Sequence, residues 1–211
     1  VAELNHPVGT MDGIAAESAI TALRFEFSRH YAVTELEKKF QNDIIHNILN
    51  GKIHSMGELQ KNTSLLGVDI NGSYRVIVFG MTNESMARGD FKAKVKDIDV
   101  LSDLIRSRIS KAKIHNDLDK IVVIQEVERE QTQEEYRKSI KKIAEQVQAD
   151  VARYNKYLKI KAGAGRVVDG IINLPESFKE ANEAFMFVDV AGETPEGGGP
   201  PGMVFAGPGV F

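Results

Sequence analysis

The sequence contains no cysteine, and this absence excludes a disulfide-stapled scaffold, thiolate catalysis and a thiolate metal site. It also lacks an excess of positive charge, since 27 Lys and Arg against 30 Asp and Glu give a net charge of -3. The chain as a whole therefore offers no electrostatic basis for binding nucleic acid. No apolar run approaches the roughly 20 residues that a membrane-spanning helix needs, so we expect no membrane segment.

The beginning of the chain lacks the pattern of a secretory signal peptide, a basic stretch followed by an apolar one, so we expect a cytoplasmic protein. Residue 1 is valine rather than methionine, and we interpret the chain as part of a longer protein. With 211 residues it has room for one good core with an appendage, or for two small domains.

The first strong pattern in the sequence is a long amphipathic segment. From Met11 to Gly51, apolar residues recur mostly at steps of three and four, which predicts one long helix with one apolar face. A helix of about 40 residues spans about 60 Å, too long for a small domain to bury alone, so we expect a partner helix. The spacing is irregular between Phe27 and Val33. The predicted dimer interface consists of Ile20, Leu23, Phe27, Leu36 and Phe40.

The middle of the chain alternates strand and helix signals. Capping boxes at Ser55 with Glu58 and at Thr132 with Glu135 predict helix starts. Strands are predicted at 74–79, 112–114, 119–125 and 158–162, with a hairpin turn at 116–117 and helices at 98–109, 132–155 and from 173. The order β-α-β-β-α-β with an added C-terminal helix predicts an α+β fold of the ferredoxin-like plan, which GGDEF and nucleotide-cyclase domains share.

The end of the chain differs in composition. Residues 189–211 hold seven of the 18 glycines and four of the six prolines. This composition predicts a flexible loop at 197–202, after which 203–205 can add a short edge strand. We therefore expect three parts: a long helix over 1–52, an α+β domain over 53–191, and a Gly/Pro-rich tail over 192–211.

The most informative motif lies late in the domain. A predicted strand leads into Gly-Ala-Gly-Arg at 163–166, which we interpret as a structural turn at Gly163, Gly165 and Arg166. Leu174 follows, and then Ser-Phe-Lys-Glu-Ala-Asn-Glu-Ala-Phe at 177–185. Two further motifs are Ala-Glu-Ser-Ala at 16–19, and residues 40–51, which run from Phe-Gln-Asn-Asp-Ile-Ile to a final Gly. In their order and spacing, these motifs resemble the PucR/CdaR family of bacterial transcriptional regulators.

The resemblance implies a regulator whose GGDEF-like domain lies between an N-terminal effector sensor and a C-terminal helix-turn-helix domain, neither of which this chain contains. The chain would then be the dimerising, signal-coupling middle of a transcription regulator, such as one of purine catabolism. DNA would be bound only through the absent domain, and a small-molecule effector through the absent sensor.

The resemblance also directs attention to the central hairpin, where active diguanylate cyclases carry Gly-Gly-Asp/Glu-Glu-Phe. Here the turn is His-Asn-Asp-Leu-Asp at 115–119, without either glycine. Asp117 and Asp119 are the residues that would bind a metal, but an Asn/Asp-rich surface turn is the interpretation that we favour. We predict no catalytic residue, no cofactor and no metal site, and therefore no enzyme.

The sequence gives little support to other kinds of binding site. The Gly-Ala-Gly-Arg segment lacks the Lys-Ser/Thr of a phosphate-binding loop and the third glycine of a dinucleotide fingerprint. The five histidines are scattered without a metal-ligand spacing. The function that we expect is non-catalytic dimerisation and signal coupling. The alternative is a domain that senses a nucleotide or small metabolite in a retained pocket.

Overall fold

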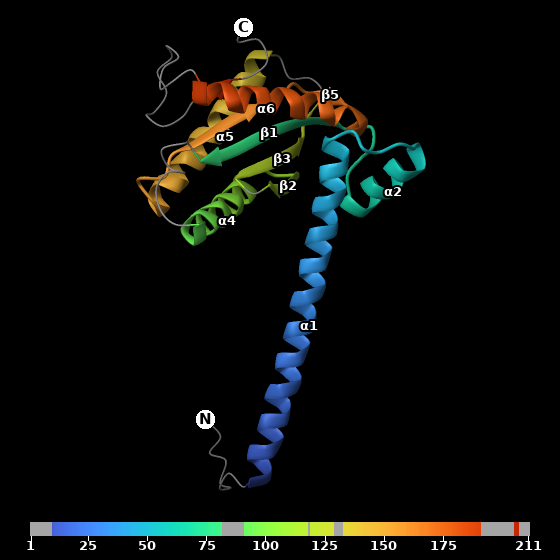
Figure 1. Ribbon diagram of the computed structural model, residues 1–211, viewed down its shortest axis with the longest axis vertical. Coiled ribbons are helices and arrows are strands. Elements are labelled where there is room, and N and C mark those ends of the chain that lie inside the picture. Colours follow the sequence, from blue (N-terminus) through green and yellow to red (C-terminus); the bar gives the residue numbers. More distant parts are fainter. Residues whose placement is uncertain (1–9, 82–90, 118, 129–132, 191–204, 207–211) are drawn as a thin grey trace. The chain divides into compact units, whose positions relative to one another are not determined.

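The computed structural model describes residues 10–81, 91–117, 119–128, 133–190 and 205–206 (Figure 1). The chain divides into two units, residues 1–43 and 44–211, which are described separately. It has a long N-terminal helix, a small sheet that is antiparallel except at one edge, and a C-terminal helix. These features confirm the predicted α+β class.

The first unit consists, in its described part, of a single helix. Helix α1, Thr10–Leu49, runs for 40 residues without interruption, close to the predicted range, and its last residues belong to the second unit (Figure 1). The irregular spacing after Phe27 therefore does not break the helix. Phe27 and Leu36 are nine residues apart, about two and a half turns, and so lie on opposite faces. The expectation of one apolar face along the whole segment is thus wrong.

Helix α2, Met56–Leu66, begins where the capping box of Ser55 and Glu58 predicts a helix start. Ser55 caps its start, with the Oγ atom accepting a hydrogen bond of 3.1 Å from the backbone N–H of Glu58. Gly67 ends the helix at a φ of +62°, in the left-handed region that favours glycine.

The sheet is built around its most buried strand. Strand β1, Ser73–Met81, is buried along its whole length and pairs antiparallel with β3, Lys120–Glu126, and with β4, Ile160–Ala164. Strand β2, Ala112–Asp117, pairs antiparallel with β3 at one edge. At the other edge β6, Phe205–Ala206, pairs parallel with β4 and overlaps the predicted edge strand at 203–205 by one residue, Phe205. The order across the sheet is β2-β3-β1-β4-β6.

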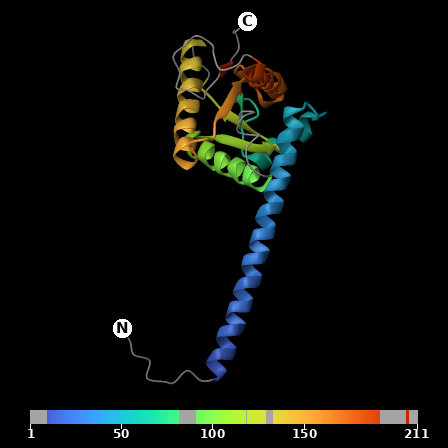
Figure 2. The same ribbon diagram turned by 60° about the vertical axis from the view of Figure 1, so that its left-hand side comes forward.

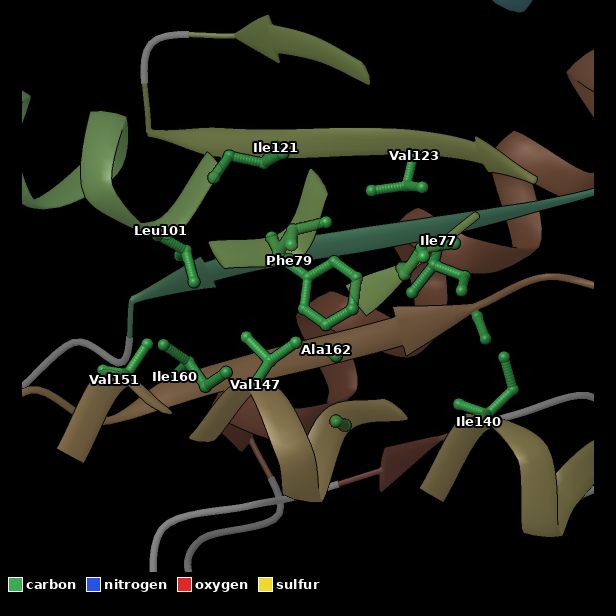
Figure 3. Close-up of a cluster of buried hydrophobic side chains, with 14 of the residues drawn as sticks. Ile77, Phe79, Leu101, Ile121, Val123, Ile140, Val147, Val151, Ile160 and Ala162 are labelled. Carbon is green, nitrogen blue, oxygen red and sulfur yellow. The ribbon is translucent and has the colours of Figure 1, made fainter. Parts of the chain in front are cut away.

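Helices cover both faces of this sheet. Helices α4, Phe91–Arg108, and α5, Gln133–Tyr154, pack on one face, where Phe79, Leu101 and Val147 are fully buried (Figure 3). Helix α6, Leu174–Val190, packs on the opposite face together with α2 and residues 44–49 of α1. Figure 2 shows α5 and α6 on the two sides of the sheet. Side chains of β1 alternate between the two cores, as expected for a central strand.

Two predicted turns lie wholly or partly in strands, and Gly165 and Arg166 of the second one follow β4 outside any strand. Asn116 and Asp117, expected to form the hairpin turn, are the last residues of β2, and Asp117 pairs with Lys120. Gly163, expected in a turn, lies within β4, whose ladder to β1 continues through a 3.0 Å hydrogen bond from the Gly165 N–H to the Val76 carbonyl. The glycines therefore serve packing of the strand rather than reversal of the chain.

A short segment links β4 to α6. Strand β5, Val168–Asp169, pairs with the start of β1, and a 3-10 turn, Ile171–Asn173, leads into α6 at the predicted position. Two predicted features lie outside the described residues: the Thr132 cap and most of the Gly/Pro-rich tail. No helix among the described residues combines the length and apolar character needed to cross a membrane.

Candidate functional site

The β2–β3 hairpin, where a cyclase would bind its metal, carries exposed carboxylates at Asp117 and Asp119. Ser102 Oγ donates a 3.2 Å hydrogen bond to Asn116 Oδ1, which ties the hairpin to α4. Among the residues that the structure describes, no group of three or more His, Asp or Glu side chains is placed to hold a metal ion. His46 and His115 come together with ring centroids 6.0 Å apart.

Beside the hairpin, two lysines flank one aromatic ring. Lys120, Gly80 and Lys161 are in register across β3, β1 and β4. The Phe185 ring lies over Gly80, where a Cβ atom would sit 2.7 Å from the Phe185 Cζ. The Lys161 Nζ is 4.2 Å and the Lys120 Nζ 5.3 Å from the ring centroid, within cation–π range. This end of the sheet is thus cationic and aromatic, whereas magnesium prefers carboxylate oxygens.

The Gly-Ala-Gly-Arg motif holds α6 against the sheet. A Cβ atom on Gly163 would lie 2.8 Å from the Phe185 Cα and would collide with the Ala181 carbonyl oxygen. A Cβ atom on Gly165 would collide with the Ser177 carbonyl. The backbone of α6 therefore packs directly on that of β4, which only glycine permits at these positions. We call these contacts the β4–α6 junction.

Two polar contacts fix this junction. Ser177 is fully buried, and its Oγ accepts a 2.9 Å hydrogen bond from the Val76 N–H and donates one of 2.7 Å to the Arg166 carbonyl. Glu180 accepts a 2.9 Å hydrogen bond from the Arg166 N–H and a second from its guanidinium. Partial burial by itself raises the pKa of Glu180, but the hydrogen bonds and charge of Arg166 outweigh it, so the pKa is lowered.

A third element joins the junction through an aromatic residue. The Tyr136 hydroxyl, on α5, donates a hydrogen bond to the Gly165 carbonyl. Burial raises the pKa of Tyr136 to about 12, with the Arg75 charge opposing and Glu180 adding to the shift. Gly165 thus connects β1, through its N–H, with α5, through its carbonyl, so the motif ties both layers of helices to the sheet.

Sequence reasoning missed a buried charge next to this network. Arg75 is 1% exposed, and its guanidinium donates to Gln125 Oε1 at 2.9 Å and Ser139 Oγ at 3.0 Å and lies over the Tyr136 ring. Its Nη1 has no hydrogen-bond partner among the described residues. Burial lowers the pKa of Arg75. The sequence held a signal of this site, since Arg75 is the one charged residue of the strand predicted at 74–79.

A shallow hollow of about 270 Å³ lies between α2 and the β5 segment. Its lining is mainly apolar, with Met56, Leu59, Ile70 and Ile172 joined by Asn71, Asp169 and Gly170. Ligand pockets usually have volumes of about 300 to 1,000 Å³ and several convergent polar groups. This hollow therefore gives no specific support to a metabolite-binding role.

The exposed part of α1 is the most unusual surface that the structure describes. Ten large apolar side chains between Met11 and Phe40 are 47% to 80% exposed. The five predicted interface residues are all among them, but they do not share one face: Ile20, Leu23 and Phe27 lie together, and Leu36 and Phe40 lie on the other side. Exposed apolar surface of this extent is typical of protein interaction sites.

Comparison with known families identifies the domain. Residues 50–186 match the family described as the GGDEF-like domain, and the chain belongs to that family. The matched range contains β1 to β4 and the β4–α6 junction. A search of curated proteins found no match.

Proposed function

We propose that this chain is the dimerising and signal-coupling region of a cytoplasmic transcriptional regulator, with no catalytic activity of its own. The observation that carries the proposal is the exposed apolar surface of α1. A 40-residue helix with ten such side chains, joined to a GGDEF-like domain, has the character of an assembly element.

The finer assignment is to the PucR/CdaR family, in which sensor and DNA-binding domains flank the GGDEF-like one. It is supported by the motif at 163–185, whose glycines, Ser177 and Ala181 all take part in the β4–α6 junction. The antiparallel strand order β2-β3-β1-β4 with α4 and α5 on one face is consistent with the ferredoxin-like plan. DNA and effector would be bound by domains outside this chain.

The mechanism that we propose is mechanical. Binding of an effector to the sensor would change the pairing of two α1 helices, and the paired GGDEF-like domains would then reposition the DNA-binding domains. The junction suits this role because a domain that transmits a displacement must move as a rigid body. Direct backbone packing of α6 on β4, fixed by the buried Ser177, supplies such rigidity.

The dimer is tested by introducing a charge into the exposed apolar surface. Phe40→Glu should convert the full chain from dimer to monomer in sedimentation velocity, because a carboxylate cannot be buried unpaired in an apolar interface. The matched control is Gln41→Glu, which adds the same charge at the next, exposed residue. If both variants remain dimeric, α1 is not the dimerising element.

The absence of catalysis is tested separately. The full chain incubated with GTP and Mg²⁺ should yield no cyclic dinucleotide, because the hairpin lacks the two glycines that let a nucleotide approach. Turnover above a buffer blank would refute this part of the proposal. A rise in melting temperature with GTP alone would instead favour a nucleotide sensor, because a ligand of the native state stabilises it by mass action.

A further inference from the structure

The exposed apolar residues of α1 form two separate stripes. The long stripe consists of Met11, Ile14, Ala22, Phe25, Val33, Leu36 and Phe40. The short stripe consists of Ile20, Leu23, Phe27 and Tyr31. Phe25 and Phe27 belong to different stripes, because a step of two residues rotates the side chain around the helix axis by a little more than half a turn.

The long stripe follows an eleven-residue repeat. Ile14, Phe25 and Leu36 are spaced by eleven, and so are Met11, Ala22 and Val33. Eleven residues are about three helical turns, so these side chains stay on one face of a nearly straight helix along about 44 Å. The stripe thus extends over almost all of the exposed helix.

The short stripe ends halfway along the same helix. The next positions on its face, at steps of three and four after Tyr31, are Thr34, Lys38 and Gln41. A partner packed on this face would meet polar side chains over the second half of the exposed segment. Only the long stripe therefore offers a continuous apolar surface to a second helix.

The helices that the structure describes leave one candidate for that second helix. The apolar faces of α2, α4, α5 and α6 are already buried in the domain, at residues such as Leu59, Leu101, Val147 and Leu174. None of these helices has a free apolar stripe of matching length. The matching surface is the long stripe of α1 in another molecule. Between residues 11 and 40, along the whole long stripe, five acidic and four basic residues nearly balance, so two copies do not strongly repel each other.

We infer that a second copy of this chain packs on the long stripe of α1 and not on the short stripe. This inference deepens the proposed function and rests on it. Leu36 and Phe40 of the predicted interface therefore stay in it, joined by Ile14, Phe25 and Val33. The other three predicted residues, Ile20, Leu23 and Phe27, lie outside it.

Arg29 is the one charged residue on the face of the long stripe, and it forms an ion pair of 2.9 Å with Glu26 of its own helix. Such a polar position within an apolar seam fixes the register of two helices.

The absence of cysteine makes a clean test possible. Phe25→Cys and Phe27→Cys each introduce one thiol into the full chain, at residues that are 69% and 72% exposed. Phe25 lies at the middle of the long stripe, so it faces its own counterpart whether the two helices run parallel or antiparallel. Under mild oxidation, Phe25→Cys should form the disulfide-linked dimer at least about tenfold faster than Phe27→Cys, because only its thiols are held together.

Light scattering on the reduced proteins shows whether a negative result refutes the proposed dimer or only the choice of the long stripe. A monomeric chain would refute the proposed dimer itself. A dimer in which Phe27→Cys cross-links as fast as Phe25→Cys, or faster, would refute the choice of the long stripe. A dimer in which neither thiol cross-links would place the interface outside α1 and would also refute it.

Discussion

Gly165 lies so close to Ser177 that a Cβ atom at position 165 would collide with the Ser177 carbonyl. The same serine bonds the β1 backbone at Val76, so one residue of α6 contacts two neighbouring strands. This contact explains in physical terms why the motif combines two glycines with a serine twelve residues after the second. The family resemblance rests on residues that hold the domain together.

Gly165→Ala should therefore destabilise the domain by about 2 kcal/mol or more, because α6 must move away from the sheet to admit the methyl group. The measurement is the urea midpoint by circular dichroism. Gly57→Ala is the matched control: nothing lies within 4 Å of a Cβ atom there, and α2 should be unchanged or slightly stabilised. Equal midpoints for the two variants would contradict the packing argument.

Ser177→Ala tests the polar half of the junction. Removing the hydroxyl leaves the buried Val76 N–H without its acceptor and the Arg166 carbonyl without its donor, at a cost of about 1 to 3 kcal/mol. The control is Ser107→Ala, which removes an exposed hydroxyl that bonds only within α4. A loss of unfolding free energy smaller than that of Ser107→Ala would mean that the β4–α6 junction relaxes around the missing hydroxyl.

Alkaline pH should weaken the fold through two tyrosines. Burial, with the charges of Glu126 and Asp69, raises the pKa of Tyr74 to about 12, and burial raises the pKa of Tyr136 to about 12. The unfolded chain loses these protons near pH 10 and the native state does not. Stability should thus fall between about pH 10 and 12, by about 1.4 kcal/mol per pH unit for each tyrosine.

The expected signature is a flatter dependence of the urea midpoint on pH above 10 in Tyr74→Phe and in Tyr136→Phe. Tyr157→Phe is the control, since this ring is 63% exposed and contacts Lys156 at the surface. The assignment fails if the two buried-tyrosine variants keep the slope of the unmodified chain.

Arg29→Leu should tighten the dimer by about tenfold, because it replaces the charged residue of the long stripe by an apolar one. The cost of this gain is a less defined register, which should appear as a broader distribution of cross-links when Phe25→Cys is combined with it. Arg24→Leu, on another face of the exposed helix, is the control. Dilution followed by sedimentation gives both dissociation constants, and a weaker dimer in Arg29→Leu would count against the assigned seam.

Much of the fold could be predicted from local signals. Such signals act within a few residues, as at the Ser55 cap, the Gly67 terminus and the β-branched run in β1. Helix α2 and strand β1 lie at the positions that these residues indicate. The two misplaced turns have a different cause. Asn116 and Gly163 have turn-forming side chains, but pairing with neighbouring strands and packing of α6 determine their conformation. Such contacts join residues distant in sequence and leave little local trace.

The α1 surface shows a second limit of the sequence pattern. Apolar residues recur at steps of three and four on both sides of the irregular spacing, yet the step of six residues from Phe27 to Val33 moves them to another face of the helix. Only a helix that continues without a break makes this rotation certain. Arg75 was missed for a related reason, because one charged residue in an apolar strand does not alter the prediction of a strand.

The central claim is that α1 joins two copies of this chain, and light scattering over a dilution series tests it most directly. We expect a mass of twice the chain at high concentration, falling toward one chain on dilution, and a lower mass for Phe40→Glu at every concentration. A mass of one chain throughout the series would contradict this claim, because the six large apolar side chains of the long stripe would then have no second copy to cover them.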